Sequence, residues 1–398
     1  KAPPPLMPVP FKVRGRVPVM VMPFRSSAAP ALTVTAAQQA GLRRLTLVEE
    51  PQAAFYDFLA HCQNQLGEIL RDVRLVLVVD VGGGTTDFSL IAVTTTNGEF
   101  GLKRIAVGDH LMLGGDNMDV ALARRVESRW TKDGRKLGTP QWLQLVQGSR
   151  AAKEALLGDP PAERHGISVL SEGSRLLGRG TLSSELLREE TETVILDGFF
   201  PAVAAGEVPS RGARAALQEL GLPYAQDPAI TRHLSAFLRQ HAAAACSALG
   251  ISTAPAVLPR PDAILFNGGV FNSPKITARL VEIVSSWWPD APALRVLPHQ
   301  SLDLAVARGA AQYGRVRHGW GRRIEGGAAH AFAGVAQGRI FAGAFHAEIG
   351  AELAVAAVAV ALAIGVVVLG GVAHHIAQRV AVMHRDEVDR GRGTALGM

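Results

Sequence analysis

Residues 75–93 carry the feature that most constrains the fold. Two near-continuous apolar runs, Leu75–Val79 and Phe88–Val93, flank a turn that contains three consecutive glycines. Apolar runs of strand length joined by a glycine-rich turn predict a β-hairpin, and strands that are apolar on both sides predict a sheet covered on both faces. Because segments with helical periodicity lie on both sides of this hairpin in the sequence, we expect an α/β fold.

Four other segments extend this pattern. Gln52–Ile69 has apolar residues at helical spacing and predicts a helix, whereas Gly101–Val107 predicts a third strand. Ala263–Phe266 predicts a final buried strand, which leads through a glycine pair into a helix over Pro274–Trp287.

Two more predictions complete the secondary structure. Leu45–Val48 reads as a short strand that precedes the first long helix. Residues 117–260 read as largely helical, with a polar and partly stranded insert around Gly166–Leu182.

The turn of the hairpin has the composition of an anion-binding loop. Gly82, Gly83 and Gly84 let the backbone take positive φ and approach a bulky anion closely. Successive N–H groups of such a turn converge into a concavity that binds anions. Thr85 and Thr86 add hydroxyl donors. These five residues are therefore predicted to bind phosphate.

Two aspartates bracket this turn. Asp80 ends a buried strand, where a carboxylate holds Mg²⁺ through water or orients an attacking water, and Asp87 starts the returning strand as a second candidate for the same role. The pattern is neither GxGxxG nor GxxxxGK[ST], which excludes the dinucleotide-binding and P-loop classes. Both aspartates are predicted to be catalytic and to bind metal.

The composition limits which binding partners and which cellular compartment are expected. The formal net charge is +6, but the basic residues are scattered among acidic ones without aromatic interleaving, so no nucleic-acid partner is expected. Cys62 and Cys246 belong to no CxxC or Cys/His cluster. They argue against a zinc site or a disulfide framework and fit the reducing conditions of the cytoplasm.

The segment Asp80–Asp87 resembles the second phosphate loop of the DnaK-like heat-shock chaperones (the heat shock protein 70 family), which has the form Asp-x-Gly-Gly-Gly-Thr-x-Asp. Upstream, the run Glu49-Glu50-Pro51-Gln52-Ala53-Ala54 is similar to the first connecting segment of this family. The resemblance implies that Glu50 lies near the magnesium ion and the attacking water, as a third catalytic residue.

Two downstream segments continue the resemblance in the same order. Leu113–Asp119 is similar to the Leu-Gly-Gly-x-x-Phe-Asp stretch of the family, either with two extra residues after the preceding Gly-Asp or with the loop aligned one step differently. This similarity implies that Gly114, Gly115 and Asp116 contact nucleotide. Ser149–Lys153 resembles the helix that packs on the adenosine. Its lysine matches the family, but an arginine replaces the glutamate; the resemblance implies adenosine contacts by Arg150 and Lys153.

The last two matching segments lie further along the chain. Ile264–Pro274 looks like the adenosine loop, which implies nucleotide contacts by Gly268, Gly269 and Asn272, the last in place of a stacking arginine. The run that begins at Asp303 is similar to the second connecting segment, whose small residues allow two lobes to approach and hinge; Asp303 is included among the expected nucleotide contacts.

The resemblance covers residues 33–314 and implies an actin-like, ribonuclease H-like bilobed ATPase domain that binds ATP or ADP with Mg²⁺. Residues 32–330 are expected to form this nucleotide-binding domain, with 32–79 as a remnant of lobe I and 80–314 mainly as lobe II. Nothing in residues 1–31 resembles the first phosphate loop of the family, so we expect the first lobe to be incomplete.

The two ends of the chain read as those of a fragment. Residues 1–31 are rich in proline and small residues and predict an unstructured leader. Residues 331–398 predict an apolar helical tail, in which the uncharged stretch 353–373 is long enough for either a membrane span or a soluble apolar helix. No peptide-binding β-sandwich is recognisable in this tail, so unfolded-protein clients are not expected as partners.

Four functions stay open at this point. The leading one is an ATP-binding, and in its fullest form ATP-hydrolysing, module of a chaperone that acts in protein folding with co-chaperones as partners. The second is a non-catalytic remnant that binds nucleotide or partners without turnover. A sugar kinase or filament-forming ATPase of the same fold is the third, and the Glu-Glu-Pro-Gln-Ala-Ala run counts against it. The fourth is an ATPase tethered to a membrane through residues 353–373.

Overall fold

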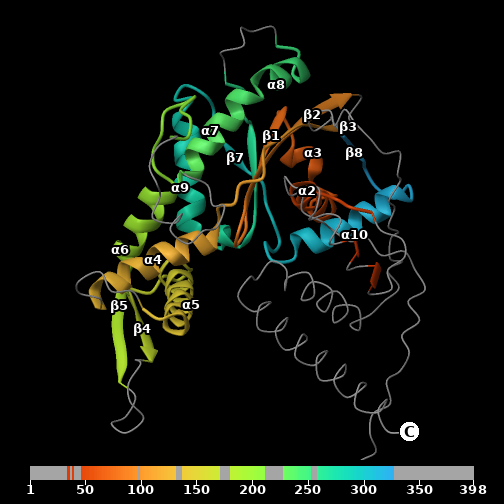
Figure 1. Ribbon diagram of the computed structural model, residues 1–398. Helices are drawn as coiled ribbons and strands as arrows, with labels where there is room; N and C mark the ends of the chain where they lie inside the picture. Colours follow the sequence, from red (N-terminus) through yellow and green to blue (C-terminus); the bar gives the residue numbers. More distant parts are fainter. Residues whose placement is uncertain are drawn as a thin grey trace, which may run out of the picture.

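The computed structural model describes residues 34–35, 38–39, 46–96, 99–130, 137–170, 180–210, 227–251 and 258–326 (Figure 1). The expected leader, the expected tail and the stretch 353–373 lie outside these residues. Within the described ranges, no helix has the length and apolar character that crossing a bilayer requires. The described residues form a mixed α/β fold built on a mixed sheet.

A six-stranded sheet of order β7-β6-β1-β2-β3-β8 lies at the centre of this fold. Its antiparallel meander consists of β1 (Leu75–Val81), β2 (Thr86–Thr96) and β3 (Glu99–Val107), while β6 (Ala263–Asn267) pairs parallel to β1. The short edge strands are β7 (Arg295–Val296) and β8 (Ile324–Gly326), each parallel to its neighbour. The expected hairpin, third strand and buried final strand are confirmed.

Helices cover both faces of this sheet, as the apolar runs predicted (Figure 1). One face carries α2 (Glu50–His61), α3 (Leu66–Ile69) and α10 (Ala305–Arg317). The other face carries α4 (Gly115–Trp130), α7 (Ile230–Gln240), α8 (Ala242–Ala248) and α9 (Pro274–Ser286). All seven residues of β1 are buried, because its side chains alternate between these two layers.

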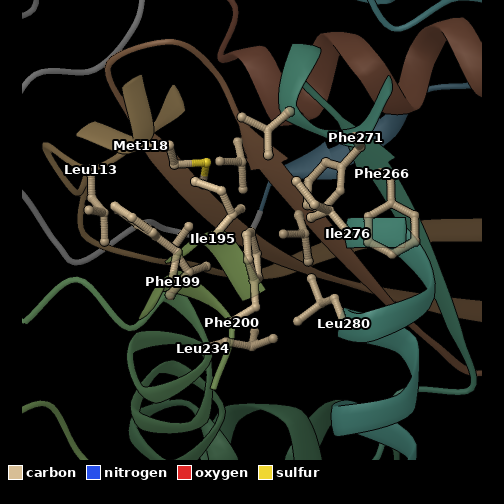
Figure 2. Close-up of a cluster of buried hydrophobic side chains, with 14 of the residues drawn as sticks. Leu113, Met118, Ile195, Phe199, Phe200, Leu234, Phe266, Phe271, Ile276 and Leu280 are labelled. Atoms are coloured by element: carbon tan, nitrogen blue, oxygen red, sulfur yellow. The ribbon is translucent and has the colours of Figure 1, made fainter. Parts of the chain in front are cut away.

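The larger apolar core lies on the second face (Figure 2). Phe266 of β6 and Phe271 pack against each other with ring centroids 4.5 Å apart, and Leu280 of α9 and Leu234 of α7 close the same core. Met118 joins this core from the first turns of α4, which fixes α4 against the sheet.

A smaller unit extends from α4, away from the sheet. It contains α5 (Thr139–Leu156), a hairpin of β4 (Arg164–Leu170) and β5 (Thr181–Leu187), α6 (Arg188–Glu192) and the π-helical turn η2 (Thr193–Asp197). The partly stranded insert expected around residues 166–182 is therefore present, as a two-stranded antiparallel hairpin.

Two predictions of secondary structure are wrong in detail. The single helix expected over residues 52–69 is two helices, because the polar run 63–65 forms a turn in which the N–H of Gln65 donates to the carbonyl of Cys62. The strand expected at residues 45–48 is absent from the described residues 46–48. There, Val48 instead packs against Ala53 and Ala310, between α2 and α10.

The crossing of α2 and α10 depends on a glycine. A Cβ atom added to Gly309 would lie only 1.7 Å from the carbonyl oxygen of Ala53, so the two helix backbones touch at this point. Beside it, Arg308 donates two hydrogen bonds of 2.8 and 2.9 Å to the carboxylate of Asp57. The small residue Gly309 thus permits close contact of two helices within one packed layer, whereas the expected approach and hinging of two lobes stays a prediction.

We expect Gly309→Ala to destabilise the protein. The added methyl group forces α10 away from α2, and overpacking of this kind costs about 1–3 kcal/mol. This loss outweighs the helix preference of alanine over glycine, which is at most about 1 kcal/mol. Urea unfolding followed by circular dichroism measures the change.

Gly67→Ala is the matched control. Gly67 lies on the exposed side of α3, and nothing lies within 4 Å of a Cβ atom added there. This variant should be as stable as the parent protein or slightly more stable. If Gly309→Ala behaved like Gly67→Ala, the backbone contact between α2 and α10 would be refuted.

Candidate functional site

Three polar side chains end neighbouring strands on the face of the sheet that α2 covers. Asp80 pairs with Asp87 across β1 and β2 and with Asn267 across β1 and β6. The preceding residues with the same orientation, Val76 and Val78 in β1, belong to the apolar core under α2. Strand alternation therefore brings Asp80, Asp87 and Asn267 together at the end of that core.

Asp80 is the most buried of the acidic groups at this point, with 3% of its surface exposed. Its Oδ2 accepts a hydrogen bond of 2.7 Å from Nδ2 of Asn267. Burial, followed by the charge of Asp87, raises the pKa of Asp80 to about 7, although the Asn267 hydrogen bond and His110 act in the opposite direction. A nearby cation would therefore stabilise the ionised form of Asp80.

Asp87 is held by a histidine that the sequence did not single out. Both of its carboxylate oxygens lie within hydrogen-bond distance of Nδ1 of His110, at 2.8 and 3.0 Å. His110 lies between β3 and α4, and its neighbour Leu111 forms a β-bridge with Thr86. That bridge carries the His110 side chain to Asp87, a contact between residues 23 positions apart that no local motif reveals.

Glu50 joins these acidic side chains from helix α2, which packs on this face of the sheet. It is the first residue of α2, and its pKa is raised well above the usual range by burial and then by the charges of Asp80 and Asp87. The structure therefore brings the three predicted catalytic residues to one place, although they come from a helix and two strands.

These residues suit a magnesium ion. Mg²⁺ keeps most of its water and takes one or two protein carboxylates together with phosphate oxygens. Asp80 and Asp87 supply two such carboxylates, and Oδ1 of the neighbouring Asn267 is buried without a hydrogen-bond partner among the described residues. Across the same residues, no group of three or more His, Cys, Asp and Glu side chains is arranged to enclose a metal ion. The site fits a hydrated ion rather than an all-protein metal site.

The glycine turn is fixed by the start of α4. The N–H groups of Gly115 and Asp116 donate to the carbonyls of Gly82 and Gly83, at 2.9 and 2.7 Å. A Cβ atom added to Gly114 would lie 2.6 to 2.8 Å from backbone atoms of this turn, so only glycine allows the contact. The two glycine segments recognised separately in the sequence thus form one backbone unit.

A cavity of about 420 Å³ opens beside this unit. It lies between the glycine turn, α4, α5 and the 3-10 turn η4 (Gly269–Asn272) that follows β6. Nine of the predicted nucleotide contacts line it: Gly82, Gly83, Gly115, Asp116, Arg150, Lys153, Gly269, Asn272 and Asp303.

Five predicted contacts do not line this cavity. The hydroxyl of Thr86 is buried and donates to the carbonyl of Leu113 at 2.7 Å, which explains its position. Gly268 has a φ of 88°, and a Cβ atom there would lie 2.2 Å from the carbonyl oxygen of Val81, so it serves the close packing of β6 on β1. The five residues are Gly84, Thr85, Thr86, Gly114 and Gly268.

The sequence also missed part of the cavity wall. Four apolar side chains form one part of it: Met118, Leu157, Val270 and Ile276. The remaining missed residues are polar or small: Asp119, Glu154, Gly158 and Ser273. Met118 and Asp119 stand one helical turn after Gly115 and Asp116, so the helical period beginning at the second glycine segment was a usable signal for both.

The charges in the cavity are paired. Nζ of Lys153 lies 2.6 Å from Oδ1 of Asp119 and donates to the carbonyl of Gly115 at 3.0 Å. Burial raises the pKa of Asp119, and the Lys153 charge opposes this rise. Arg150 forms a hydrogen bond of 3.0 Å with Glu154, which raises the pKa of the guanidinium. Both basic groups of α5 therefore reach the cavity already oriented by acidic partners.

Comparisons with known proteins match the first part of the chain. The family model described as Hsp70 protein matches residues 19–159. Proteins named chaperone protein HscA homolog are similar to about the same length of chain. The one from Acinetobacter baylyi is 32% identical over 147 residues, which is 36% of this chain and 22% of the relative.

Two further relatives with this name agree. The protein from Rickettsia bellii is 35% identical over 144 residues, covering 36% of this chain and 21% of its own length. The protein from Burkholderia ambifaria is 33% identical over 159 residues, covering 40% of this chain and 23% of its own length. The chain thus spans about a fifth of the length of these curated relatives. The matched region contains Glu50, the glycine turn and the start of α4, and over residues 19–159 the resemblance to the Hsp70 family is confirmed.

Proposed function

We propose that the chain is the ATP-binding module of a DnaK-like chaperone, built on an actin-like ATPase domain. The cavity between the glycine turn, α4, α5 and η4 carries this proposal, because it adjoins a buried carboxylate pair that suits magnesium. Its volume of about 420 Å³ lies in the range of small-molecule sites. The assignment of residues 32–79 and 80–314 to two lobes is part of the proposal; β1 crosses the boundary between them.

The lining of the cavity offers two kinds of chemistry. The apolar side chains of Met118, Leu157 and Ile276 suit a purine base, while Arg150 and Lys153 provide donors for polar groups of the nucleotide. The glycine turn contributes backbone groups, where phosphate is expected. Both ATP and ADP meet these requirements.

The carboxylates would act at the phosphate groups of the nucleotide. Magnesium held by Asp80 and Asp87 would neutralise phosphate charge, which is the main protein-assisted contribution to phosphoryl transfer. Glu50, whose pKa is raised, would orient a water molecule and accept its proton. Asn267 keeps Asp80 in place through its 2.7 Å hydrogen bond.

A second candidate is nucleotide binding without turnover. Both oxygens of Asp87 already face Nδ1 of His110, and a carboxylate engaged in this way is a poorer ligand for a metal ion or a water molecule. A measurable rate of phosphate release from Mg-ATP would exclude this candidate, whereas binding without release would support it. Co-chaperones as partners, and a role in protein folding, belong to the leading proposal.

We expect Gly269→Leu to block the nucleotide site. Gly269 lines the cavity, and the nearest atom to an added Cβ is Nδ2 of Asn272 at 4.0 Å, so a larger side chain can be placed at this lining position without striking the backbone. Affinity for Mg-ATP and Mg-ADP, measured by titration calorimetry on the full chain, should fall by at least roughly tenfold, or about 1.4 kcal/mol.

Gly67→Leu provides the control. It adds the same side chain at an exposed position of α3, where nothing lies within 4 Å. It should bind nucleotide as the parent protein does. Unchanged binding in Gly269→Leu would place the nucleotide elsewhere, and a folded parent protein that binds neither nucleotide would refute the proposed function.

The raised pKa of Asp80 predicts that the metal-free protein becomes less stable as pH rises. Because its folded pKa of about 7 exceeds the ordinary unfolded value of about 3.9, the folded state holds more protons between these values. The free energy of unfolding should therefore fall as pH rises from about 4 to 7, by up to about 1.4 kcal/mol per pKa unit, and then level off.

Asp80→Asn tests this pH dependence of stability. Asparagine still accepts the hydrogen bond from Asn267 but cannot ionise, so the variant should be more stable than the parent protein at pH 8 in EDTA while binding Mg-ATP more weakly. Urea unfolding between pH 5 and 8.5 measures the difference. Asp290→Asn removes an exposed carboxylate of the same charge and should not change the pH dependence. A less stable Asp80→Asn variant at pH 8 would contradict the burial of an ionised Asp80.

A further inference from the structure

The start of α2 is held to the sheet by an ion pair. Glu49 is the N-cap residue of this helix and has extended backbone angles, with its carbonyl accepting from the N–H of Ala53 at 2.8 Å. The preferred N-cap residues, Ser, Thr, Asp and Asn, accept a hydrogen bond from an N–H group of the first turn through their side chain. The Glu49 side chain makes no such bond and pairs instead with Nη1 of Arg104 in β3.

Arg104 occupies a particular place on β3. It pairs with Ile91 and, on its other side, with Gly326 of β8. Like Leu102, it lies on the face covered by α2, just before the irregularity that lets Ile105 bulge out of the pairing with β2. The row of α2-facing side chains on β3 therefore ends with the positive charge of Arg104, which lies beside the first turn of α2.

This pair is a poor stabilising device. The side chains of Arg104 and Glu49 are only 11% and 25% exposed, and Nε of Arg104 is buried with no hydrogen-bond partner among the described residues. Desolvation of a guanidinium with one donor unsatisfied offsets most of the attraction between the charges. What the pair does provide is a fixed position for the N-terminus of α2, and the first residue of this helix, Glu50, lies close enough to Asp80 and Asp87 to feel their charges.

We propose that Arg104 is a positioning residue of the nucleotide site: by holding Glu49, it sets Glu50 against the carboxylates of Asp80 and Asp87. This inference rests on the proposed function, since it concerns the magnesium-dependent part of nucleotide binding. When a hydrated ion is held by Asp80 and Asp87, the Glu50 carboxylate would be available to interact with its water. Without Arg104, Glu49 loses the ion pair that ties the residue before Glu50 to β3.

The test separates the metal-dependent from the metal-independent part of nucleotide affinity. ADP is titrated into the full chain in Mg²⁺ and in EDTA. The dissociation constant in EDTA divided by that in Mg²⁺ is then compared between variants. In Arg104→Met this ratio should fall by roughly tenfold, the usual effect of removing a group that orients a metal site. Affinity in EDTA should be unchanged, because Arg104 does not line the cavity.

Lys103→Met is the matched control. Lys103 is the preceding residue of β3, is exposed, and carries the same charge, so the change in net charge is identical. It should leave the ratio as in the parent protein. Arg104→Lys, which keeps a cation beside Glu49, should restore most of the ratio lost in Arg104→Met.

Glu49→Gln keeps the inference testable if Arg104→Met does not fold. It removes the other partner and should lower the ratio to a similar degree, and in the double variant the two losses should not add. A parent protein with a clear magnesium dependence that Arg104→Met and Glu49→Gln both retain would overturn the inference alone. Equal losses in Mg²⁺ and in EDTA would overturn it too, since they indicate general damage to the fold. A parent protein without nucleotide binding would instead refute the proposed function.

Discussion

The alternation of side chains along three adjacent strands is the constraint on which the rest of this structure depends. β1 is buried on both faces, and on the face under α2 the apolar side chains of β1, β2 and β6 end in Asp80, Asp87 and Asn267. A carboxylate at the end of such a layer has no bulk water to solvate it, so burial raises the pKa of Asp80 to about 7. The same geometry that completes the core therefore creates a site with a demand for positive charge.

Glycines then determine how closely the surrounding elements approach that site. Gly114 lets the start of α4 dock its N–H groups on the glycine turn, and Gly309 lets α10 touch the backbone of α2 at Ala53. The first contact forms one wall of the cavity, and the second supports the helix whose first residue is Glu50. Both glycines act through close backbone contact, so a larger side chain at either position moves an element that carries residues of the proposed site.

Polar contacts between side chains orient the remaining residues. Lys153 is held by Asp119 and Arg150 by Glu154 on the wall of the cavity, His110 lies against Asp87, and Arg104 holds Glu49 at the start of α2. Such pairs contribute little net stability, because desolvation offsets the attraction in the partly buried ones and solvent screens it in the exposed Arg150–Glu154 pair. Their contribution is positional, and it explains why so many of the charged groups near the cavity come from different elements.

The sequence by itself determined the hairpin around the glycine turn, the third strand, the buried strand β6 and nine of the residues that line the cavity, because these follow from local periodicity and from short motifs. Tertiary structure alone decided the partners of these residues. His110, Asn267 and Arg104 reach Asp87, Asp80 and Glu49 across 23, 187 and 55 positions, and the break between α2 and α3 interrupts an apolar pattern that reads as one helix. Such contacts depend on strand register and on a bulge in β3, and neither leaves a local signal in the amino-acid sequence.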